Sequence, residues 1–318
     1  MPHDVSAIVS CYRGEKYLAR FLQNYSEQSY FEHMEMVIDM NLPSTDELAI
    51  VKGFQDEHPG RLKVLISEQL LSFGASWNRC IRASNGEYVA IWNIDDLRER
   101  TSVERQAAAI AAPSGVDVAY GDYTVVSRFG STDGEIVTYQ DIQPEQFTRK
   151  FLLGPFFMFR RSLLEKAGMV DEQFRAAGDY DLGIRLALHG HVERVDGTLG
   201  YYLNAGTGLS TSTNTPGPAE VAAIYLRYGV YDELNFALLP QTSAYNIYSA
   251  FYGGEWHHIS SLVPDYDAML SRRYERWFDI GALYHFTSSL RTGDRGLNRF
   301  ANLMAGRSRK NRGPNCSP

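Results

Sequence analysis

This sequence contains few cysteines, no long apolar run and no excess of basic residues. Its three cysteines, Cys11, Cys80 and Cys316, stand far apart, which excludes a disulfide framework and a cysteine-rich metal site and favours a reducing compartment. No apolar stretch approaches the ~20 residues that a membrane span needs, and the polar His3 and Asp4 predict no secretory signal peptide. The net charge of −7 argues against wholesale binding to nucleic acid. We therefore expect a cytoplasmic globular protein.

Short apolar runs alternate with segments of helical periodicity through the first 120 residues. This alternation predicts a parallel sheet with right-handed crossovers, and the continuous apolar character of the strands suits a sheet covered on both faces. The predicted strands are 5–9, 34–38, 62–66, 88–92 and 116–120, and the predicted helices cover 17–25, 45–54 and 76–83.

The pattern is less regular beyond residue 120. Residues 121–150 are polar and predict only a hairpin, at Phe129-Gly130 or Asp133-Gly134. The small polar residues 204–216 predict either a loop that closes over a ligand or a solvated linker. The regular elements that we expect are a strand in 151–161, helices over 162–168 and 179–189, a strand over 195–203, and mostly helix from Glu220 onward.

Two adjacent carboxylates directly follow the predicted strand 88–92. Ligands of open α/β sheets gather at the carboxyl ends of the strands, and strand alternation would point Asn93 and Asp95 one way and Asp96 the other. Oxygen ligands at this spacing can hold a hard divalent cation together with a substrate phosphate. The alternative is an ordinary helix cap ahead of residues 101–105.

Several segments, in this order and spacing, resemble family 2 of the nucleotide-sugar-dependent glycosyltransferases, which have the GT-A fold. The resemblance covers about residues 4–212. The segments that carry it are Val9-Ser10-Cys11-Tyr12-Arg13, Tyr17-Leu18, Asp39 to Asp46, Ser76-Trp77-Asn78-Arg79-Cys80, Gly86-Glu87-Tyr88-Val89-Ala90, Asn93-Ile94-Asp95-Asp96, Val170-Asp171-Glu172 and Gly178-Asp179-Tyr180-Asp181-Leu182-Gly183-Ile184-Arg185.

Three positions depart from the family pattern. Asn93 stands where the family has the first Asp of its metal-binding motif, which removes one charge. Trp77 replaces an Arg that contacts phosphate, a role that the neighbouring Arg79 could take. Gly178 replaces an acidic residue and leaves Asp179 as the candidate base.

The resemblance implies an α/β fold, a GT-A type Rossmann-like and mostly parallel sheet sandwiched by helices, with a helical C-terminal region. It implies a glycosyltransferase domain over 1–215, whose nucleotide-binding half is about 1–120 and whose acceptor half is about 121–215. Residues 216–318 form the C-terminal region with a basic tail. The implied enzyme is an inverting, hexosyltransferase-type glycosyltransferase of polysaccharide or glycoconjugate synthesis. Its partners would be a nucleoside-diphosphate sugar and a carbohydrate or lipid-linked acceptor.

The resemblance also assigns roles to individual residues. Asp179 would be the catalytic general base, and Asp95 with Asn93 would hold Mn²⁺ or Mg²⁺ against the diphosphate. The residues expected to bind the donor are Ser10, Tyr12, Glu15, Asp39, Asn78, Asn93, Asp95 and Asp96.

Simpler interpretations stay open for several of these residues. Asp179 also suits a helix N-cap, Asp39 also suits a turn, and Asp181 and Arg185 are spaced to pair with each other on one helical face. The alternative functions are a non-catalytic sugar-nucleotide-binding or scaffold protein and a nucleotidyltransferase. A dinucleotide oxidoreductase is disfavoured because no Gly-x-Gly-x-x-Gly follows the first strand.

The C-terminal third lies outside the resemblance. Its tyrosines are expected to pack helices rather than to bind sugar. Its tail, residues 291–312, is basic and carries apolar residues at roughly helical spacing. Two interpretations stay open for this tail, a peripheral contact with anionic lipid at the inner face of the membrane or a solubilising, partly disordered end.

Overall fold

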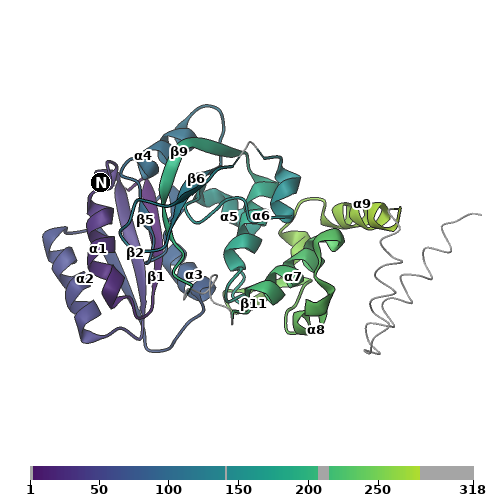
Figure 1. Ribbon diagram of the computed structural model, residues 1–318, viewed down its shortest axis with the longest axis horizontal. Coiled ribbons are helices and arrows are strands. Elements are labelled where there is room, and N and C mark those ends of the chain that lie inside the picture. The colour runs from purple at the N-terminus through teal and green to yellow at the C-terminus, as the bar shows by residue number, and fades with distance from the viewer. Residues whose placement is uncertain (1–2, 140–141, 207–214, 280–318) are drawn as a thin grey trace, which may run out of the picture.

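The computed structural model describes residues 3–139, 142–206 and 215–279, and a mixed, mostly parallel sheet forms its centre (Figure 1). In the order β3-β2-β1-β4-β8-β6-β9-β5, only β8 and β5 run antiparallel to their neighbours, and β7 adds a further antiparallel pair with β6. The strands are β1 (Val5–Cys11), β2 (Met34–Asn41), β3 (Leu62–Ser67), β4 (Tyr88–Ile91), β5 (Leu97–Arg98), β6 (Val118–Val126), β7 (Glu135–Val137), β8 (Met158–Arg160) and β9 (Val192–Leu203).

Helices cover both faces of this sheet, as the apolar strands require. One face packs against α1, α2 and α4, which contribute Phe21, Val51 and Val103 to a shared core. The other face packs against α3, α5 and α6, which contribute Trp77, Ala167 and Leu182. The helices are α1 (Glu15–Ser26), α2 (Thr45–Glu57), α3 (Phe73–Ala83), α4 (Ser102–Ala111), α5 (Leu164–Ala167) and α6 (Gly178–His189).

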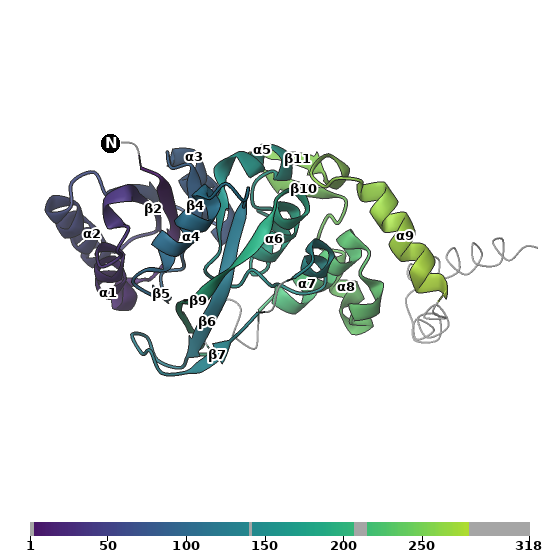
Figure 2. The same cartoon turned by 90° about the horizontal axis from the view of Figure 1, so that it is seen from above.

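The C-terminal region packs on the outer side of α6 (Figure 2). Tyr180 and Ile184 of α6 share a core with Ile224 and Tyr228 of α7, and Met269 of α9 joins it. The elements here are α7 (Gly217–Tyr228), α8 (Leu239–Thr242), the hairpin of β10 (Ser249–Tyr252) and β11 (Glu255–His258), and α9 (Tyr266–Asp279). The prediction that Tyr228 packs between helices is therefore confirmed, while the β10–β11 hairpin was not expected from the sequence.

The polar segment 121–150 contains more strand than the sequence predicts. β6 continues to Val126 because Asp122 and Thr124, although polar, are nearly buried against neighbouring elements. Asp122 accepts hydrogen bonds from Arg194 Nε (3.1 Å) and Nη2 (2.6 Å), and these bonds satisfy its charge inside the sheet. The predicted hairpin forms between β6 and β7.

Two further predictions fall on residues that the structure does not describe. These are most of the loop 204–216, of which residues 207–214 lie outside the described part, and the basic tail 291–312 with Cys316. Within the described ranges, every helix is too short or too polar to span a membrane.

Candidate functional site

The carboxyl ends of the parallel strands β1, β2, β4 and β9 meet at one edge of the sheet. The helices after β1 and β2 and the turn after β4 begin at this edge, where loops rather than strands carry the polar residues. Open α/β sheets bind their ligands at this carboxyl edge. The candidate site is built from the loops that leave β1, β2 and β4 and from the start of α6.

Asp95 and Asp96 follow β4 in a tight turn, in which the Asp96 N–H donates to the Asn93 carbonyl at 3.2 Å. The strand alternation expected through Asn93 and Asp96 is therefore wrong, because the chain turns after β4 and brings their side chains into contact. The Asn93 Nδ2 donates to Asp96 Oδ2 at 3.0 Å.

Asp96 is a buried structural anchor of this turn. Its Oδ1 accepts a hydrogen bond from the backbone N–H of Leu203, at the end of β9, at 2.9 Å. Burial, followed by the charge of Asp95, raises the pKa of Asp96 well above its ordinary value. With both oxygens engaged by the protein and the side chain only 1% exposed, Asp96 offers no oxygen to the donor. The donor-binding role expected for Asp96 has no support from this geometry.

Asp95 is the carboxylate of this turn that reaches solvent. Its side chain is partly exposed. Partial burial raises the pKa of Asp95, and the positive charge of Lys16 opposes that rise. The Oδ1 of Asn93 has no hydrogen-bond partner among the described residues, since only its Nδ2 is used. The Asp95 carboxylate, which accepts a hydrogen bond from its own backbone N–H, and the Oδ1 of Asn93 therefore offer one carboxylate and one amide oxygen to a ligand.

These two oxygens fit a divalent cation that arrives together with a phosphate group. Nowhere in the described ranges do three or more His, Cys, Asp or Glu side chains gather into a preformed metal cage. Mg²⁺ is commonly held by one or two carboxylates with substrate phosphates and water completing its shell. The donor set suits such a shared site and is too small for tight binding by the protein alone.

The side chain of Glu47 stabilises the conformation of the loop after β1. This buried glutamate closes the capping box of α2 with Ser44. Its Oε1 also accepts the Gly14 N–H at 2.6 Å and the Cys11 thiol at 3.7 Å. A side chain at Gly14 would meet the Cys11 Sγ at 2.7 Å, so the loop requires glycine there.

Three predicted donor-binding residues lie on this loop or next to it. Ser10 is half-buried at the end of β1, Tyr12 is 39% exposed, and Glu15 is exposed at the first position of α1. Arg13 stacks over the Tyr12 ring at 5.0 Å. All three predicted side chains therefore lie where the carboxyl edge meets solvent, and their role in binding stays a prediction.

Asp39 and Asn78 are already bonded to the protein. Arg79 Nη1 donates to both oxygens of Asp39, at 3.0 and 3.2 Å, and the Asp39 side chain is buried. Burial raises the pKa of Asp39, and Ser76 and Arg79 oppose that shift.

Asn78 bridges to the segment that leads toward α6. Its Nδ2 donates to the Val170 carbonyl (2.8 Å) and to Glu172 Oε1 (2.9 Å), and its Oδ1 accepts the Val170 N–H (3.0 Å). The side chain is fully buried, so the donor-binding role expected for Asn78 has no support from the geometry. Nothing in the sequence around Asn78 indicates that its side chain bonds inside the protein rather than to a ligand at the surface.

Asp179 lies in the first turn of α6 and is partly exposed. Its Oδ1 accepts the Tyr180 N–H at 2.8 Å. Burial, and to a smaller extent the charge of Glu220, raises its pKa from 3.8 to about 6 against the opposing hydrogen bond from the Tyr180 N–H. The neighbouring Asp181 does not contribute to this shift, because Arg185 and Arg227 neutralise its charge.

Asp181 forms the predicted pair with Arg185, at 2.8 Å, and both side chains are buried. Arg227 of α7 adds a second ion pair to Asp181 at 2.7 Å. Together these arginines lower the pKa of Asp181 to about 2 in spite of its burial. The pairing prediction is confirmed, and the partner on α7 is an addition that the sequence did not indicate.

Asp179 lies at the same edge of the sheet as Asp95. A side chain at Gly178 would meet the Phe73 ring at 3.1 Å, and Phe73 opens α3, the crossover helix that begins at the carboxyl edge. The loop before α3 is tied to β2, since Asn41 Oδ1 accepts the Leu71 N–H at 3.0 Å. The candidate base and the candidate phosphate site therefore share one edge rather than opposite sides of the sheet.

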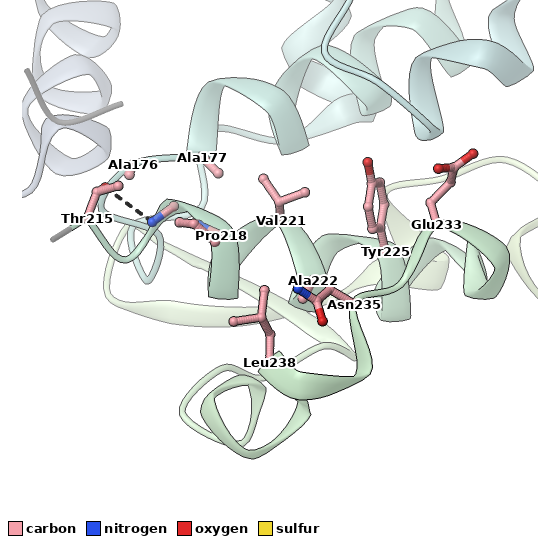
Figure 3. Close-up of a pocket in the computed structure, with 11 residues that line it drawn as sticks. Ala176, Ala177, Thr215, Pro218, Val221, Ala222, Tyr225, Glu233, Asn235 and Leu238 are labelled. Atoms are coloured by element: carbon pink, nitrogen blue, oxygen red, sulfur yellow. Dashed lines mark hydrogen bonds between the residues drawn. The ribbon is translucent and has the colours of Figure 1, made fainter. Parts of the chain in front are cut away.

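A pocket of about 640 Å³ opens beside the start of α6 (Figure 3). Its walls come from the segment before α6, from α7 and from the residues that follow α7. Small and apolar side chains dominate its lining, while Thr215, Glu233 and Asn235 supply polar groups. Such a lining, apolar with a few polar groups, is typical of ligand pockets. Ala176 and Ala177, which line it, directly precede Gly178 and Asp179.

The sheet and the helices on both of its faces define a class: an α/β protein of the GT-A type. The model of glycosyl transferase family 2 matches residues 6–168, half of the chain. The chain belongs to that family, as the resemblance predicted. α6 and the C-terminal region lie beyond the matched residues.

Two relatives share part of the chain, and one of them is named as an uncharacterised glycosyltransferase. The glycosyltransferase MJ1057 of Methanocaldococcus jannaschii is 23% identical over 186 residues, which cover 57% of this chain and 63% of that protein. The amylovoran biosynthesis glycosyltransferase AmsB of Erwinia amylovora is 21% identical over 193 residues, 57% of this chain and 62% of that one. The chain thus spans just under two thirds of the length of these relatives.

Solved structures with this fold extend the similarity to most of the chain. TarS of Staphylococcus aureus in complex with UDP-GlcNAc superposes with a TM-score of 0.60 at 18% identity, covering 94% of this chain and 79% of that one. The mannosyltransferase PcManGT of Pyrobaculum calidifontis, in complex with GDP-Man and Mn²⁺, superposes with a TM-score of 0.51 at 15% identity, covering 96% and 86%. At these identities the likeness establishes the GT-A fold.

Proposed function

We propose that the protein is an inverting glycosyltransferase that moves a sugar from a nucleoside-diphosphate sugar to an acceptor hydroxyl, with Asp179 as the general base. The observation that carries this proposal is a partly exposed carboxyl, at the carboxyl edge of the sheet, whose pKa is raised to about 6. A general base works best when its pKa lies near the working pH. Asp179 meets that condition, whereas an ordinary exposed aspartate does not.

The donor would lie across the ends of β1, β2 and β4. Ser10, Tyr12 and Glu15 would line the nucleoside, and Asp39 would accept a hydrogen bond from the base if Arg79 leaves one of its lone pairs free. Two similar folds bind UDP-GlcNAc and GDP-Man, which supports a nucleotide-sugar donor.

Asp95 and the Oδ1 of Asn93 would hold the divalent cation beside the diphosphate. When bound, Mn²⁺ or Mg²⁺ offsets the negative charge that develops on the leaving diphosphate. Mn²⁺ in the related mannosyltransferase fold supports this assignment. The raised pKa of Asp95 implies that acid would weaken the site, because a protonated carboxyl is a poor ligand for a hard cation.

Asp179 would remove the proton from the acceptor hydroxyl as the oxygen attacks the sugar carbon. The new bond forms on the face opposite the leaving group, the bond to the diphosphate oxygen breaks, and the proton ends on the Asp179 carboxylate. This single displacement inverts the configuration of the sugar carbon. The carbon passes through an oxocarbenium-like state, as in glycoside hydrolysis.

The acceptor would approach from the side of the pocket in Figure 3, which begins one residue before the helix that carries Asp179. Small apolar walls with a few polar side chains suit either a carbohydrate or the sugar end of a lipid-linked acceptor. A relative named for amylovoran biosynthesis supports a role in polysaccharide or glycoconjugate synthesis, and the similar structures with UDP-GlcNAc and GDP-Man support a hexose-type donor.

The Asp179→Asn variant tests the assignment of the base. With UDP-GlcNAc and GDP-mannose as probes and Mn²⁺ present, we expect turnover of the accepted donor to fall by about 10²–10⁴-fold, with donor binding in a thermal-shift assay unchanged. In the unaltered protein kcat/KM should rise with pH through about 6, as Asp179 loses its proton. Asp46→Asn, an exposed position on α2, is the control.

Turnover that survives in Asp179→Asn would contradict the proposal. Donor binding without turnover in the unaltered protein would instead identify a non-catalytic sugar-nucleotide-binding protein. Asp95→Ala should abolish the Mn²⁺-dependent part of the donor's thermal shift, which reports on the cation separately from the base.

A further inference from the structure

A glutamate from the C-terminal region occupies the N-terminal end of the helix that carries Asp179. Three successive backbone N–H groups ahead of α6 point at its carboxylate. Arg175 N donates to Glu220 Oε1 at 2.8 Å, and Ala176 N and Ala177 N donate to Oε2 at 2.7 and 2.9 Å. Glu220 is fully buried in the first turn of α7.

The Glu220 carboxylate caps the start of α6 from outside the helix. Ala177 is the N-cap of α6 and makes no side-chain cap bond, while Asp179 accepts the Tyr180 N–H within the first turn. Successive N–H groups at the start of a helix form a site for an anion. Backbone N–H groups left without partners at a helix start cost stability, and Glu220 supplies acceptors for the N-cap N–H and for the two N–H groups before it.

Contacts with Tyr245 and with α6 hold Glu220 in its position. Tyr245 donates its hydroxyl to Glu220 Oε1 at 3.4 Å, and α7 is anchored to α6 by the Arg227–Asp181 ion pair. The carboxylate therefore has little freedom to leave the segment 175–177. Because Asp179 follows Ala177 by two residues, the position of Glu220 determines where the candidate base begins its helix.

We propose that Glu220 is the positioning residue of the candidate base: it locks the segment 175–177 and thereby fixes the Asp179 carboxylate at the edge where the acceptor arrives. This inference rests on the proposed function, since it assigns Glu220 a part in the reaction only if Asp179 is the base. Glu220 itself is buried against the backbone and touches no substrate.

The charge of Glu220 has a second consequence. Burial raises the pKa of Asp179, and the negative charge of Glu220 raises it further. The other groups around the start of α6 do not share this effect. Phe73 of α3 is uncharged, the Asp181 carboxylate is neutralised by Arg185 and Arg227, and Arg175, at the surface, carries the opposite charge.

The test compares Glu220→Gln with Glu145→Gln in the full chain. Glu145 is exposed and has no side-chain bond to α6, so its variant removes the same charge without touching the segment 175–177. We would follow the ¹³C NMR titration of the Asp179 carboxyl, together with the pH dependence of kcat/KM for the accepted donor.

In Glu220→Gln we expect the Asp179 midpoint to fall by roughly half a unit to one unit, as for the loss of one nearby and partly screened charge. The acid limb of kcat/KM should move by the same amount, kcat should fall severalfold, and the donor KM should stay unchanged. Glu145→Gln should leave all four values unchanged. A midpoint in Glu220→Gln equal to that of the unaltered protein overturns the inference.

If Glu220→Gln does not fold, Glu220→Asp replaces it. The shorter side chain keeps the charge but cannot reach all three N–H groups, so kcat should fall while the Asp179 midpoint stays in place. Unchanged kcat in this variant overturns the positioning role. The NMR titration needs no turnover, so a failure of the proposed function, seen as an active Asp179→Asn variant, is distinguished from a failure of this inference.

Discussion

The amide nitrogen of Asn93 stabilises the turn after β4. Its amide nitrogen donates to Asp96 Oδ2 at 3.0 Å, a bond that a carboxylate at position 93 could not make at neutral pH. Asp96 is buried and holds the end of β9 through Leu203. The departure from the family pattern thus replaces the carboxylate expected at this position with an amide N–H that satisfies a buried carboxylate.

Asn93→Asp should therefore destabilise the protein even though it restores the family residue. We expect a loss of about 1–3 kcal/mol at pH 8, because Asp96 loses a hydrogen bond and gains a like charge. The loss should shrink at pH 5, since burial raises the pKa of Asp96 and one carboxyl of the new pair can then hold a proton and donate it. Urea unfolding at both pH values measures this.

Asp95→Asn is the matched control for this prediction. It removes a charge that raises the pKa of Asp96 without removing a hydrogen bond to that residue, so it should not reduce stability. An Asn93→Asp variant as stable as the unaltered protein at pH 8 would show that the Asn93–Asp96 bond contributes nothing.

Single residues are also where the sequence informs least about the site. The pattern located Asp39, Asp95, Asp96 and Asp179 correctly at the carboxyl edge, because strand ends and helix starts are visible in the spacing of apolar residues. It could not separate their roles. Whether a carboxylate is free, as Asp95 is, or fully bonded inside, as Asp96 is, depends on long-range partners such as Leu203, which no local pattern specifies.

At the scale of elements, Glu47 couples helix α2 to the loop after β1. Its carboxylate closes the capping box with Ser44 and also accepts the Gly14 N–H at 2.6 Å. The spacing of Ser44 and Glu47 is that of a capping box, a signal that is local in the sequence. The second contact spans 33 residues and has no local signal.

Glu47→Ala should weaken both connections. We expect a loss of about 1–3 kcal/mol, because a helix cap is lost and the buried Gly14 N–H is left without its acceptor. The nucleotide should also bind more weakly, since the loop that carries Tyr12 is no longer held. Urea unfolding and thermal shifts with UDP and GDP measure the two effects.

Asp46→Ala provides the comparison on the same helix. Asp46 is exposed in the first turn of α2 and interacts with the helix dipole only, an effect of about 0.3–1 kcal/mol. Equal losses in the two variants, or unchanged nucleotide binding in Glu47→Ala, would contradict the coupling of α2 to the loop.

Elements with apolar periodicity were predicted well, and elements with polar strands were not. β2 and β4 are buried throughout, and β1 is buried except at Ser10, so most of their residues are apolar and the strands are easily recognised. β6 beyond residue 120 and the β10–β11 hairpin carry polar or exposed residues. Their strand conformation is set by partners such as Arg194, which neutralises Asp122 from another strand.

At the scale of the whole molecule, the C-terminal region is connected to the glycosyltransferase fold by buried charges. Arg227 of α7 pairs with Asp181 of α6 at 2.7 Å and with Asp171, ahead of α6, at 2.9 Å, and all three side chains are fully buried. Tyr228 adds a hydrogen bond to Asp181 at 2.9 Å. The division of the chain at residue 215 stays a prediction, but these bonds argue that residues 1–215 would not keep the start of α6 in place alone.

Arg227→Met tests this connection in the full chain. Removing one member of a buried ion network leaves charges without partners, which costs about 3–5 kcal/mol, and here both Asp171 and Asp181 would lose a partner. The exposed pair of Arg149 with Asp232, at 2.7 Å, is the control, because Arg149→Met should cost only about 0–1 kcal/mol. Urea unfolding compares the two variants. Equal losses of stability in both would mean that α7 is held by apolar packing and not by its buried arginine.

Arg227→Met should also affect turnover, because α7 carries Glu220. We expect this variant to lower kcat more than it raises the donor KM.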